Sequence, residues 1–569
     1  MPRASPAIRC TGGARRSTTP TRPAGSARSR WPSTPARPTE EHTLSRPGFV
    51  LEVDDRTPPL VVHEGLGFRL ESFPLGTRVV YPPESIPAVP DVEEAIREAL
   101  LHPHDSEPLP ALLRPGMRLT IAFDDLSLPL PTMRAPDIRG RIIEQVLTMA
   151  AEAGVDDVQL IAANALHRRM TAAELQHIVG ERVFRSFYPQ GQLYNFDAED
   201  RDNLAHLGTT DKGEDVEISR RAAESDLLVY VNVNLVAMDG GHKSVGIGLA
   251  SYRSLRHHHN AKTMVHSRSF MDHKHSAMHH SAWRMGRLIK EHVKVFQIET
   301  TLNNDVFPKP FDFLQKREWE WSVKDQATML GVRRGLSVAP QRMRHKMFHD
   351  LRSVYGLTGV NAGEVEAVHE RTLQKVHQQH LVEVQGQSDV LVMGVPYLGP
   401  YNVSSSMNPI LATCMGLGYY FNSYRGQPVV RKGGAVILYH PLNEGFNQLH
   451  HPSYVDFYEE VLAESTDPAV VGEKYEQQFA QDPWFIHLYR TSHAYHGVHP
   501  FYMWYWAAHA MDHLDEVIWV GADRRVAARL GFRAASTLAD ALEMASGTVG
   551  TSPSITYLHN PPHLLADVR

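Results

Sequence analysis

Cysteine is scarce in this sequence: the 569 residues include two, Cys10 and Cys414. So few cysteines exclude a disulfide framework and favour a cytoplasmic location. The sequence also lacks any run near eighteen consecutive apolar residues, so it predicts no transmembrane helix and no membrane partner. An excess of positive charge is missing too, because the formal net charge is −6 with histidine neutral. That balance gives no support for a nucleic-acid partner.

The N-terminal stretch differs in composition from the rest. It is rich in Arg, Pro, Ser and Thr, has no acidic residue before Glu40, and lacks the apolar core of a secretory signal. The composition resembles that of an organelle transit peptide, but the prolines disfavour an amphipathic helix. We therefore predict a disordered tail, or a start assigned too far upstream, over residues 1–47.

Strand and helix patterns alternate from Arg114 onward. Apolar runs typical of buried strands alternate with stretches of helical periodicity. The predicted order is strand 118–125, helix 137–155, strand 156–165, helix 171–187 and strand 226–234. The second helix opens with Thr171 and Glu174, the spacing of a capping box. This alternation predicts a parallel α/β sheet.

A second α/β unit follows toward the C-terminus. Its predicted elements are strand 390–395, helix 406–421, strand 433–442, an aromatic-rich helix 493–514, strand 516–522, helix 537–550 and a last strand from 554. We expect two α/β domains with mostly parallel sheets, one over residues 48–335 and one over residues 345–569. We expect the active site in the cleft between them.

Polar residues stand where the first three predicted strands end. They are Asp124 and Asp125, then His167, then the loop Gly240-Gly241-His242-Lys243. Because ligands bind beyond the carboxyl ends of strands in such sheets, these three loops predict one site. His167, between a buried strand and a helix cap, is placed as a general base would be.

Two features allow other interpretations when taken alone. A lysine behind glycines is typical of phosphate binding, but this loop matches neither the Walker pattern nor the dinucleotide fingerprint. A glycine turn with a solvated lysine explains it equally well. The histidine clusters, including His257, His258 and His259, are compatible with an ordinary polar surface.

Four motifs in order resemble those of the nickel-dependent lactate racemase family. They are "DDLSLPLP" from Asp124, "LHRRMTAAEL" from Leu166, "HLGTTDKGEDV" from His206, and "GGHKSVGIGLASYRSLRHHH" from Gly240. The resemblance runs from about residue 116 to 304 and continues more weakly through the C-terminal half.

The resemblance implies a cofactor and a set of roles. In that family a lysine carries a nickel-pincer nucleotide, and one histidine completes the square-planar nickel site, as suits Ni(II). Lys243 matches the attachment lysine, with Gly240, Gly241 and Ser244 around the cofactor, and His259, sixteen residues on, matches the nickel ligand. His167 matches an acid/base residue and Asp125 a polar group that supports the site. The glycine pair would let the backbone approach the cofactor closely.

This sequence also departs from the family pattern. The family's second histidine, ten residues before the lysine, is Val233 here, and the arginine that clamps the substrate carboxylate is Leu128. Ser405 and Asn408 stand where the C-terminal domain presents a glutamine and a lysine. We expect His242 to substitute for the missing base.

Further histidines and aromatic residues from the C-terminal half are expected to contribute to the pocket: His493, His496, His499, Tyr502, Trp504 and Trp506. An alternative is that they belong to a packing helix. Such a pocket would suit a larger, less acidic substrate than lactate, such as a sugar-like or aromatic hydroxy compound.

The expected function is racemization or epimerization of a hydroxylated carbon, in a 2-hydroxy acid or related substrate, by hydride transfer to the cofactor. Separate biosynthetic proteins would be needed to make that cofactor. Two alternatives stay open: an oxidoreductase that acts on one face of its substrate with the same cofactor, and a non-catalytic homologue that binds a ligand.

Overall fold

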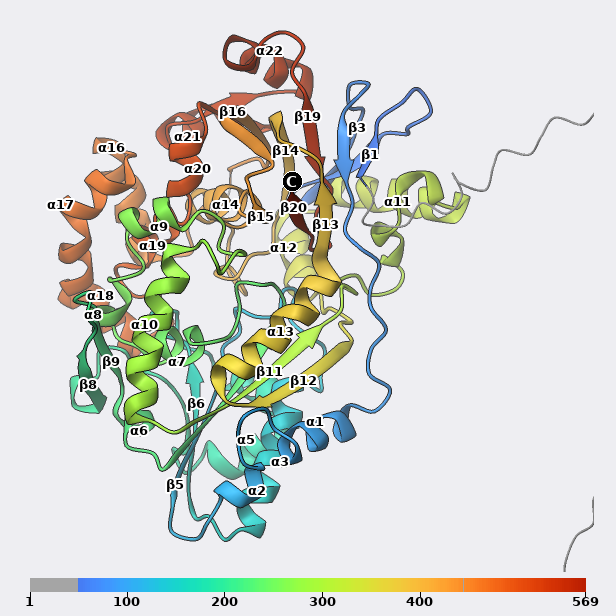
Figure 1. Cartoon of the computed structure of the whole chain (residues 1–569). Coiled ribbons are helices and arrows are strands. Elements are labelled where there is room, and N and C mark those ends of the chain that lie inside the picture. The colour runs from blue at the N-terminus through green and yellow to red at the C-terminus, as the bar shows by residue number, and fades with distance from the viewer. Residues whose placement is uncertain (1–49, 444) are drawn as a thin grey trace, which may run out of the picture. The chain divides into compact units, whose positions relative to one another are not determined.

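The sequence folds around two mixed sheets, shown with their helices in Figure 1. The computed structural model describes residues 50–443 and 445–569. The tail predicted over residues 1–47 lies outside the described residues.

The first sheet holds the N-terminal half of the site. Within the described residues it has six strands in the order β12-β11-β10-β5-β6-β7. Their bounds are β5 Arg118–Asp124, β6 Asp157–Ala163, β7 Leu193–Asn195, β10 Leu227–Asn234, β11 Val295–Leu302 and β12 Leu357–Gly363. Neighbouring strands are parallel except β12, which runs antiparallel to β11.

The second sheet is formed mainly by the C-terminal half. Among the described residues it has nine strands, with the main order β1-β4-β19-β14-β16-β17-β18, and β2 joins β14 and β3. Their bounds are β1 Val50–Glu52, β2 Leu60–Gly65, β3 Gly67–Glu71, β4 Arg78–Val80, β14 Ser388–Pro396, β16 Val430–Tyr439, β17 Glu516–Val520, β18 Arg533–Ala535 and β19 Ile555–Leu558. All pairs except β1 with β4 and β2 with β3 are parallel.

Two smaller sheets complete the strand pairing of the described residues. One pairs β8 Leu204–Thr209 with β9 Asp215–Ser219, and the other joins β13 Leu381–Val384, β20 Leu565–Val568 and β15 Tyr424–Gly426.

Helices connect the strands throughout. In the first half they are α1 Val92–Leu101, α2 Leu109–Leu112, α3 Ile138–Glu152, α4 Ala172–Val179, α5 Glu181–Phe187, α6 Arg220–Ala223, α7 Lys243–Gly248, α8 Tyr252–Leu255, α9 Ala261–Ser267, α10 Ala277–His292, α11 Val323–Val338 and α12 Gln341–His349. Later helices are α13 Val365–His380, α14 Pro409–Thr413, α15 Pro452–Asp456, α16 Leu462–Glu464, α17 Pro468–Gln481, α18 Pro483–Thr491, α19 His499–Tyr505, α20 Ala508–His513, α21 Arg524–Arg529 and α22 Leu538–Val549.

The predicted α/β class with mostly parallel sheets is confirmed, and so is the capping box at Thr171. Three predicted helices are subdivided. Gly180, with φ of 83°, separates α4 from α5 because that backbone conformation ends a helix. The helix predicted over 406–421 is α14 followed by a π-helical turn, Cys414–Tyr420. The aromatic helix predicted over 493–514 is α19 and α20.

The strands do not divide along the predicted domain boundaries. The strands between residues 50 and 80 join the second sheet, whereas β12 joins the first, and the described residues belong to one compact unit. The division into domains at residues 335–345 therefore stays a prediction. Each of the two sheets contains at least one strand from the other side of that boundary.

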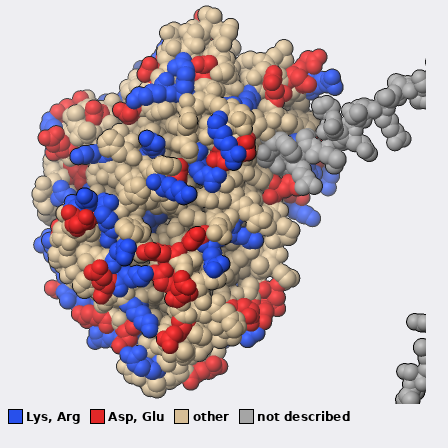
Figure 2. Space-filling model, viewed as in Figure 1, with Lys and Arg blue, Asp and Glu red and all other residues tan. Residues whose placement is uncertain are grey.

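The described surface carries charges of both signs. Figure 2 shows basic and acidic side chains interspersed over the face in view. Among the described helices, none combines the length and the apolar character needed to cross a membrane.

Candidate active site

One pocket collects the polar residues at the strand ends of the first sheet. Asp124 ends β5, His167 follows β6, and Lys243 is the first residue of α7, which follows β10. Other lining residues include Asp125, Asn232, Gly240, Ser244 and His259 from the first half and Tyr401, Tyr419 and Trp506 from the second. Both halves of the chain therefore supply walls of the same pocket, at the sheet edge where the sequence places it.

His167 is held by a carboxylate. Its Nδ1 lies 2.8 Å from Oδ2 of buried Asp125, whose Oδ1 accepts hydrogen bonds from the backbone and the hydroxyl of Ser127. Burial alone would raise the pKa of Asp125, but the His167 ring and these hydrogen bonds outweigh it and lower that pKa. An ionised Asp125 only accepts, so Nδ1 of His167 carries a proton and Nε2 is the basic nitrogen.

Asp124 is a second carboxyl in the pocket. Its Oδ2 accepts from the Val233 backbone and from Nδ2 of Asn232, both at 2.7 Å, and its Oδ1 accepts from the Tyr230 hydroxyl at 3.1 Å. Burial raises the pKa of Asp124 to about 7, against the opposing effect of its donors. A carboxyl that titrates near neutrality can both give and take a proton, which gives Asp124 a chemical capacity that its position in the sequence did not reveal.

Lys243 stands in the same pocket with its amine uncommitted. Within the described residues its Nζ makes neither a hydrogen bond nor an ion pair, although Asp239 and Glu299 lie near enough to act on its charge. Burial lowers the pKa of Lys243 to about 8, and the nearby carboxylates only partly offset this. An amine with this pKa is partly neutral near physiological pH, which is the state that forms covalent bonds.

The glycine pair has a packing role. A Cβ at Gly240, where φ is 85°, would lie 2.4 Å from Nδ2 of Asn234, and one at Gly241 would lie 2.8 Å from His369. The space beside both glycines is thus filled by the protein's own side chains. These contacts and the positive φ angles are enough to require glycine at both positions, and the close approach of the backbone to a cofactor stays a prediction.

The three consecutive histidines have three different environments. His257 lies 3.9 Å from Asp215, His258 is fully buried, and His259 lines the pocket. Nδ1 of His258 and Nδ1 of His259 are 2.5 Å apart. This contact leaves Nε2 of His259 without a hydrogen-bond partner among the described residues. Of the three, His259 is the one placed to offer a ring nitrogen to a ligand beside Lys243.

Aromatic side chains from the second half close the pocket. The Trp506 ring stacks on Tyr419 with centroids 5.5 Å apart and meets the His259 ring edge-on at 5.7 Å. The Tyr419 hydroxyl lies 2.7 Å from that of Tyr401. Nε1 of Trp506 and Oδ1 of Asn232 are buried and have no hydrogen-bond partner within the described chain. Unpartnered polar atoms in the wall of a pocket are typical of a site that binds a ligand.

Several residues expected at the site lie elsewhere. His242 is not among the described lining residues; its ring packs on Gly286 and its Nε2 contacts Glu366 at 3.1 Å. Ser405 and Asn408 both face Nδ1 of His451, each at 3.4 Å. The structure therefore gives no support to His242 as a substitute base or to the latter pair as substrate contacts.

The histidines of the aromatic segment are engaged away from the pocket lining. His493 bonds to the Arg169 carbonyl and His496 to Glu199. His499 is buried behind the pocket, with its ring 5.5 Å from that of His167 and its Nδ1 bonded to Tyr454.

Ser244 does line the pocket, but its hydroxyl accepts a hydrogen bond from Gln297. Among the described residues, no group of three or more His, Cys, Asp and Glu side chains is arranged to hold a metal on its own.

Comparison with known proteins agrees with the geometry. Residues 67–272 match the lactate racemase N-terminal domain, and this range contains Asp125, His167, Lys243 and His259. The chain is a divergent lactate-racemase-like protein.

Two curated relatives are lactate racemases at low identity. That of Lactiplantibacillus plantarum is 25% identical over 174 residues, which are 30% of this chain and 39% of the relative. That of Thermoanaerobacterium thermosaccharolyticum is 25% identical over 171 residues, 29% of this chain and 38% of the relative. The chain thus matches about two fifths of the length of each relative.

The fold of the lactate-racemase-like protein extends beyond that segment. The solved structure of the lactate racemase apoprotein from Thermoanaerobacterium thermosaccharolyticum superposes with a TM-score of 0.58 at 16% identity. The superposition covers 89% of this chain and 99% of the other. At this identity the comparison supports the fold of both halves and no individual residue role.

Proposed function

We propose that this lactate-racemase-like protein inverts a hydroxylated carbon in a small molecule. The single observation that supports this most is that Lys243, His259 and the Asp125–His167 pair line one pocket at the strand ends of the matched domain. These are the positions to which the family resemblance gives chemical roles.

The residues present are compatible with a nickel-pincer nucleotide. Lys243 offers an uncommitted amine whose pKa is lowered to about 8, and His259 offers a free ring nitrogen in the same pocket. The unpartnered Oδ1 of Asn232 would accept a hydrogen bond from a ligand, and the unpartnered Nε1–H of Trp506 would donate one. Lys243 and His259 would hold the group, which when bound supplies a reversible acceptor for the hydride of the hydroxylated carbon.

His167 would move the hydroxyl proton. With Nδ1 committed to Asp125, Nε2 can take the proton from the substrate hydroxyl as the carbon–hydrogen bond breaks, and can return it afterwards. Asp125 keeps the ring in this tautomer and stabilises its charged form. The walls formed by Tyr401, Tyr419 and Trp506 would exclude water during the reaction.

Asp124 is our candidate for the second acid/base group. The family's second histidine is replaced by Val233, and the backbone N–H of Val233 donates to the Asp124 carboxylate. The Val233 side chain itself is buried in the core, whereas its neighbour Asn232 lines the pocket and also donates to Asp124, so a titratable group is held at this end of β10. Its pKa of about 7 is suited to proton transfer in either direction.

The substrate is proposed to carry an apolar group where lactate racemases bind a carboxylate. Leu128 lines both the Lys243 pocket and a neighbouring cavity of about 130 Å³, whose other walls include Leu130, Met415 and Leu564. A dry apolar cavity of about 150 Å³ accommodates a benzene ring. We therefore favour hydroxy compounds with a branched or aromatic side group.

A second candidate function is an oxidoreductase that acts on one face of its substrate. Val233 favours it, because the base expected for the opposite face is absent there. In that case one enantiomer would be converted to its ketone while an added second ketone takes up the hydride and is reduced, and the other enantiomer would not appear.

The test uses protein purified with its bound cofactor and single enantiomers of lactate and of an aromatic 2-hydroxy compound. We expect the opposite enantiomer to accumulate on chiral chromatography, faster for the aromatic compound. Leu128→Arg is expected to shift the ratio of kcat/KM toward lactate by about tenfold or more, because the guanidinium fork binds a carboxylate. Ketone without inversion would favour the second candidate, and an unchanged ratio in Leu128→Arg would contradict the assigned role of Leu128.

A further inference from the structure

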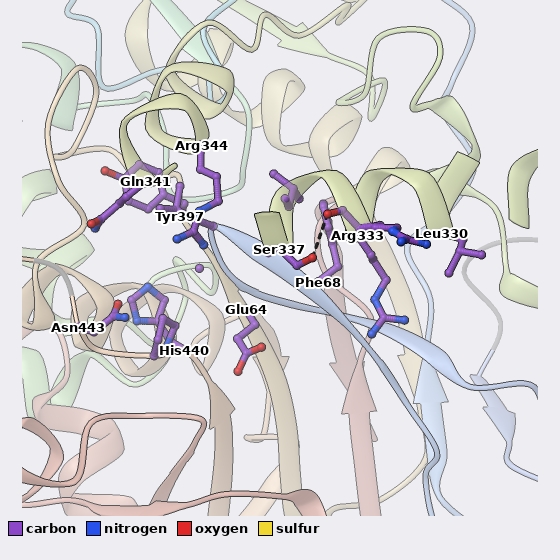
Figure 3. A pocket seen from close by; sticks show the side chains of 16 residues that line it. Glu64, Phe68, Leu330, Arg333, Ser337, Gln341, Arg344, Tyr397, His440 and Asn443 are labelled. Carbon is purple, nitrogen blue, oxygen red and sulfur yellow. Dashed lines mark hydrogen bonds between the residues drawn. The ribbon is translucent and has the colours of Figure 1, made fainter. Parts of the chain in front are cut away.

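A second, larger cavity lies away from the Lys243 pocket. It has a volume of about 700 Å³ and shares no described lining residue with that pocket. Helices α11 and α12 cover it, and its floor is formed by the carboxyl ends of β2, β14 and β16 at Gly65, Tyr397 and His440 (Figure 3). Its position is the one where α/β sheets bind ligands, and its size is that of a small-molecule site.

Positive charge dominates the lining of this cavity. Arg333 and Arg334 from α11 and Arg344 from α12 line it, and their guanidinium groups form no hydrogen bond or ion pair with another described residue. Nε of Arg344 is buried and unpartnered. Figure 3 shows Arg333 and Arg344 extending from the helices toward the strand ends.

The carboxylate at the cavity does not neutralise these arginines. Glu64 is the one acidic side chain among the described lining residues, and it is already bound by Arg69 at 2.7 and 2.9 Å. Uncompensated guanidinium groups in a concave site attract anions, because the low-dielectric walls concentrate their field.

A buried donor points to the same conclusion. His440 is fully buried, and its Nδ1 accepts from the Leu442 backbone at 3.0 Å, so its proton is on Nε2. That Nε2–H has no partner among the described residues. It faces Gly65, where φ is 55° and a Cβ would lie 3.2 Å from the nitrogen. Burial lowers the pKa of His440 to about 3, so it is a neutral donor.

We propose that this cavity binds a small molecule bearing a phosphate or diphosphate group. Arg333 and Arg344 would each present two parallel N–H donors to the phosphate oxygens, the geometry for which arginine is suited. The unpartnered donor of His440 would be satisfied at the floor. Phe68, Leu330 and Leu336 leave an apolar side for the organic part of the molecule. The proposal goes beyond the proposed reaction and does not depend on it.

The experiment is calorimetric titration of the full chain at low salt with inorganic diphosphate, with ADP, and with adenosine. We expect saturable binding of diphosphate and ADP with one site per chain, and no binding of adenosine. Arg344→Ala and Arg333→Ala should each weaken diphosphate binding by about tenfold or more, the cost of losing hydrogen bonds to a charged group. Arg342→Ala, an exposed residue of α12 outside the cavity lining, should bind as the parent does.

Three results would overturn the proposal. They are no diphosphate or ADP binding at millimolar concentration, equal binding by the Arg344→Ala, Arg333→Ala and Arg342→Ala variants, and loss of binding in Lys243→Ala, which would place the anion in the other pocket. Tighter binding of ADP than of diphosphate would identify an organic phosphate as the ligand, and tighter binding of diphosphate would identify the inorganic ion. Circular dichroism establishes whether each variant is folded. If Arg344→Ala is not folded, the diphosphate affinity of Arg333→Ala decides the test.

Discussion

His167→Gln lowers the rate of inversion of the hydroxylated carbon by about 10²–10⁴-fold, the range that a positioned general base contributes. Glutamine approximates the size of the ring but cannot take a proton near neutral pH. The measurement is kcat for both enantiomers with protein of equal cofactor content. His280→Gln is the control, because His280 is exposed on α10 and bonds to the Lys274 carbonyl.

The Asp125→Asn variant tests whether Asp125 acts through the protonation of the His167 ring. An amide at residue 125 can donate to Nδ1 of His167, which would place the ring proton on Nε2 and leave no basic nitrogen toward the pocket. We expect a loss in kcat of the same order as for His167→Gln, with little further loss in the double variant, because the two residues act as one unit. A loss below about tenfold in both single variants would contradict the role of the pair as general base.

Arg139→Met destabilises the fold by about 3–5 kcal/mol, because it leaves the Asp137 carboxylate buried without a partner. The two side chains are fully buried and joined by hydrogen bonds at 2.8 and 2.9 Å. Arg139 also donates to the carbonyls of Asp124 and Asp125 at 2.8 and 2.5 Å. The pair therefore fixes the backbone that carries both carboxyl groups of the site.

Urea denaturation measures this effect as the change in free energy of unfolding. Arg114→Met is the matched control, because the Arg114–Asp226 pair is exposed and its loss should cost no more than about 1 kcal/mol. Replacing both buried partners, as Arg139→Met with Asp137→Leu, should recover much of the lost stability, since no charge then stays buried alone. Equal decreases in the free energy of unfolding for Arg139→Met and Arg114→Met would show that the buried Arg139–Asp137 pair does not stabilise the fold more than an exposed pair does.

The sequence predicts strands β5, β6 and β10 of the first sheet because the signal of each is local, whereas β7, β11 and β12 were not predicted. Buried strands 118–124 and 227–234 are near-continuous apolar runs, and the helices between them carry their own caps. Polar residues directly after such strands reach the same sheet edge in a parallel sheet, so Asp125, His167 and Lys243 meet. Their roles remain proposals.

What the sequence could not reveal depends on distant contacts. His242 precedes Lys243 in the chain, yet the start of α7 turns it onto Gly286, more than forty residues away, and spacing does not determine that direction. Short strands such as β4, three residues long, show no period of their own and pair with β19 near the C-terminus. The arginine-lined cavity likewise joins residues from four separate segments, so no motif marks it.

The central claim is that Lys243 carries the cofactor with which a hydroxylated carbon is inverted. The most direct measurement is the mass of the peptide containing Lys243, from protein purified out of its native host, together with a nickel determination. We expect a large added mass on Lys243 and about one nickel per chain. That added mass should be absent in Lys243→Arg. An unmodified Lys243 in protein without nickel would contradict the account.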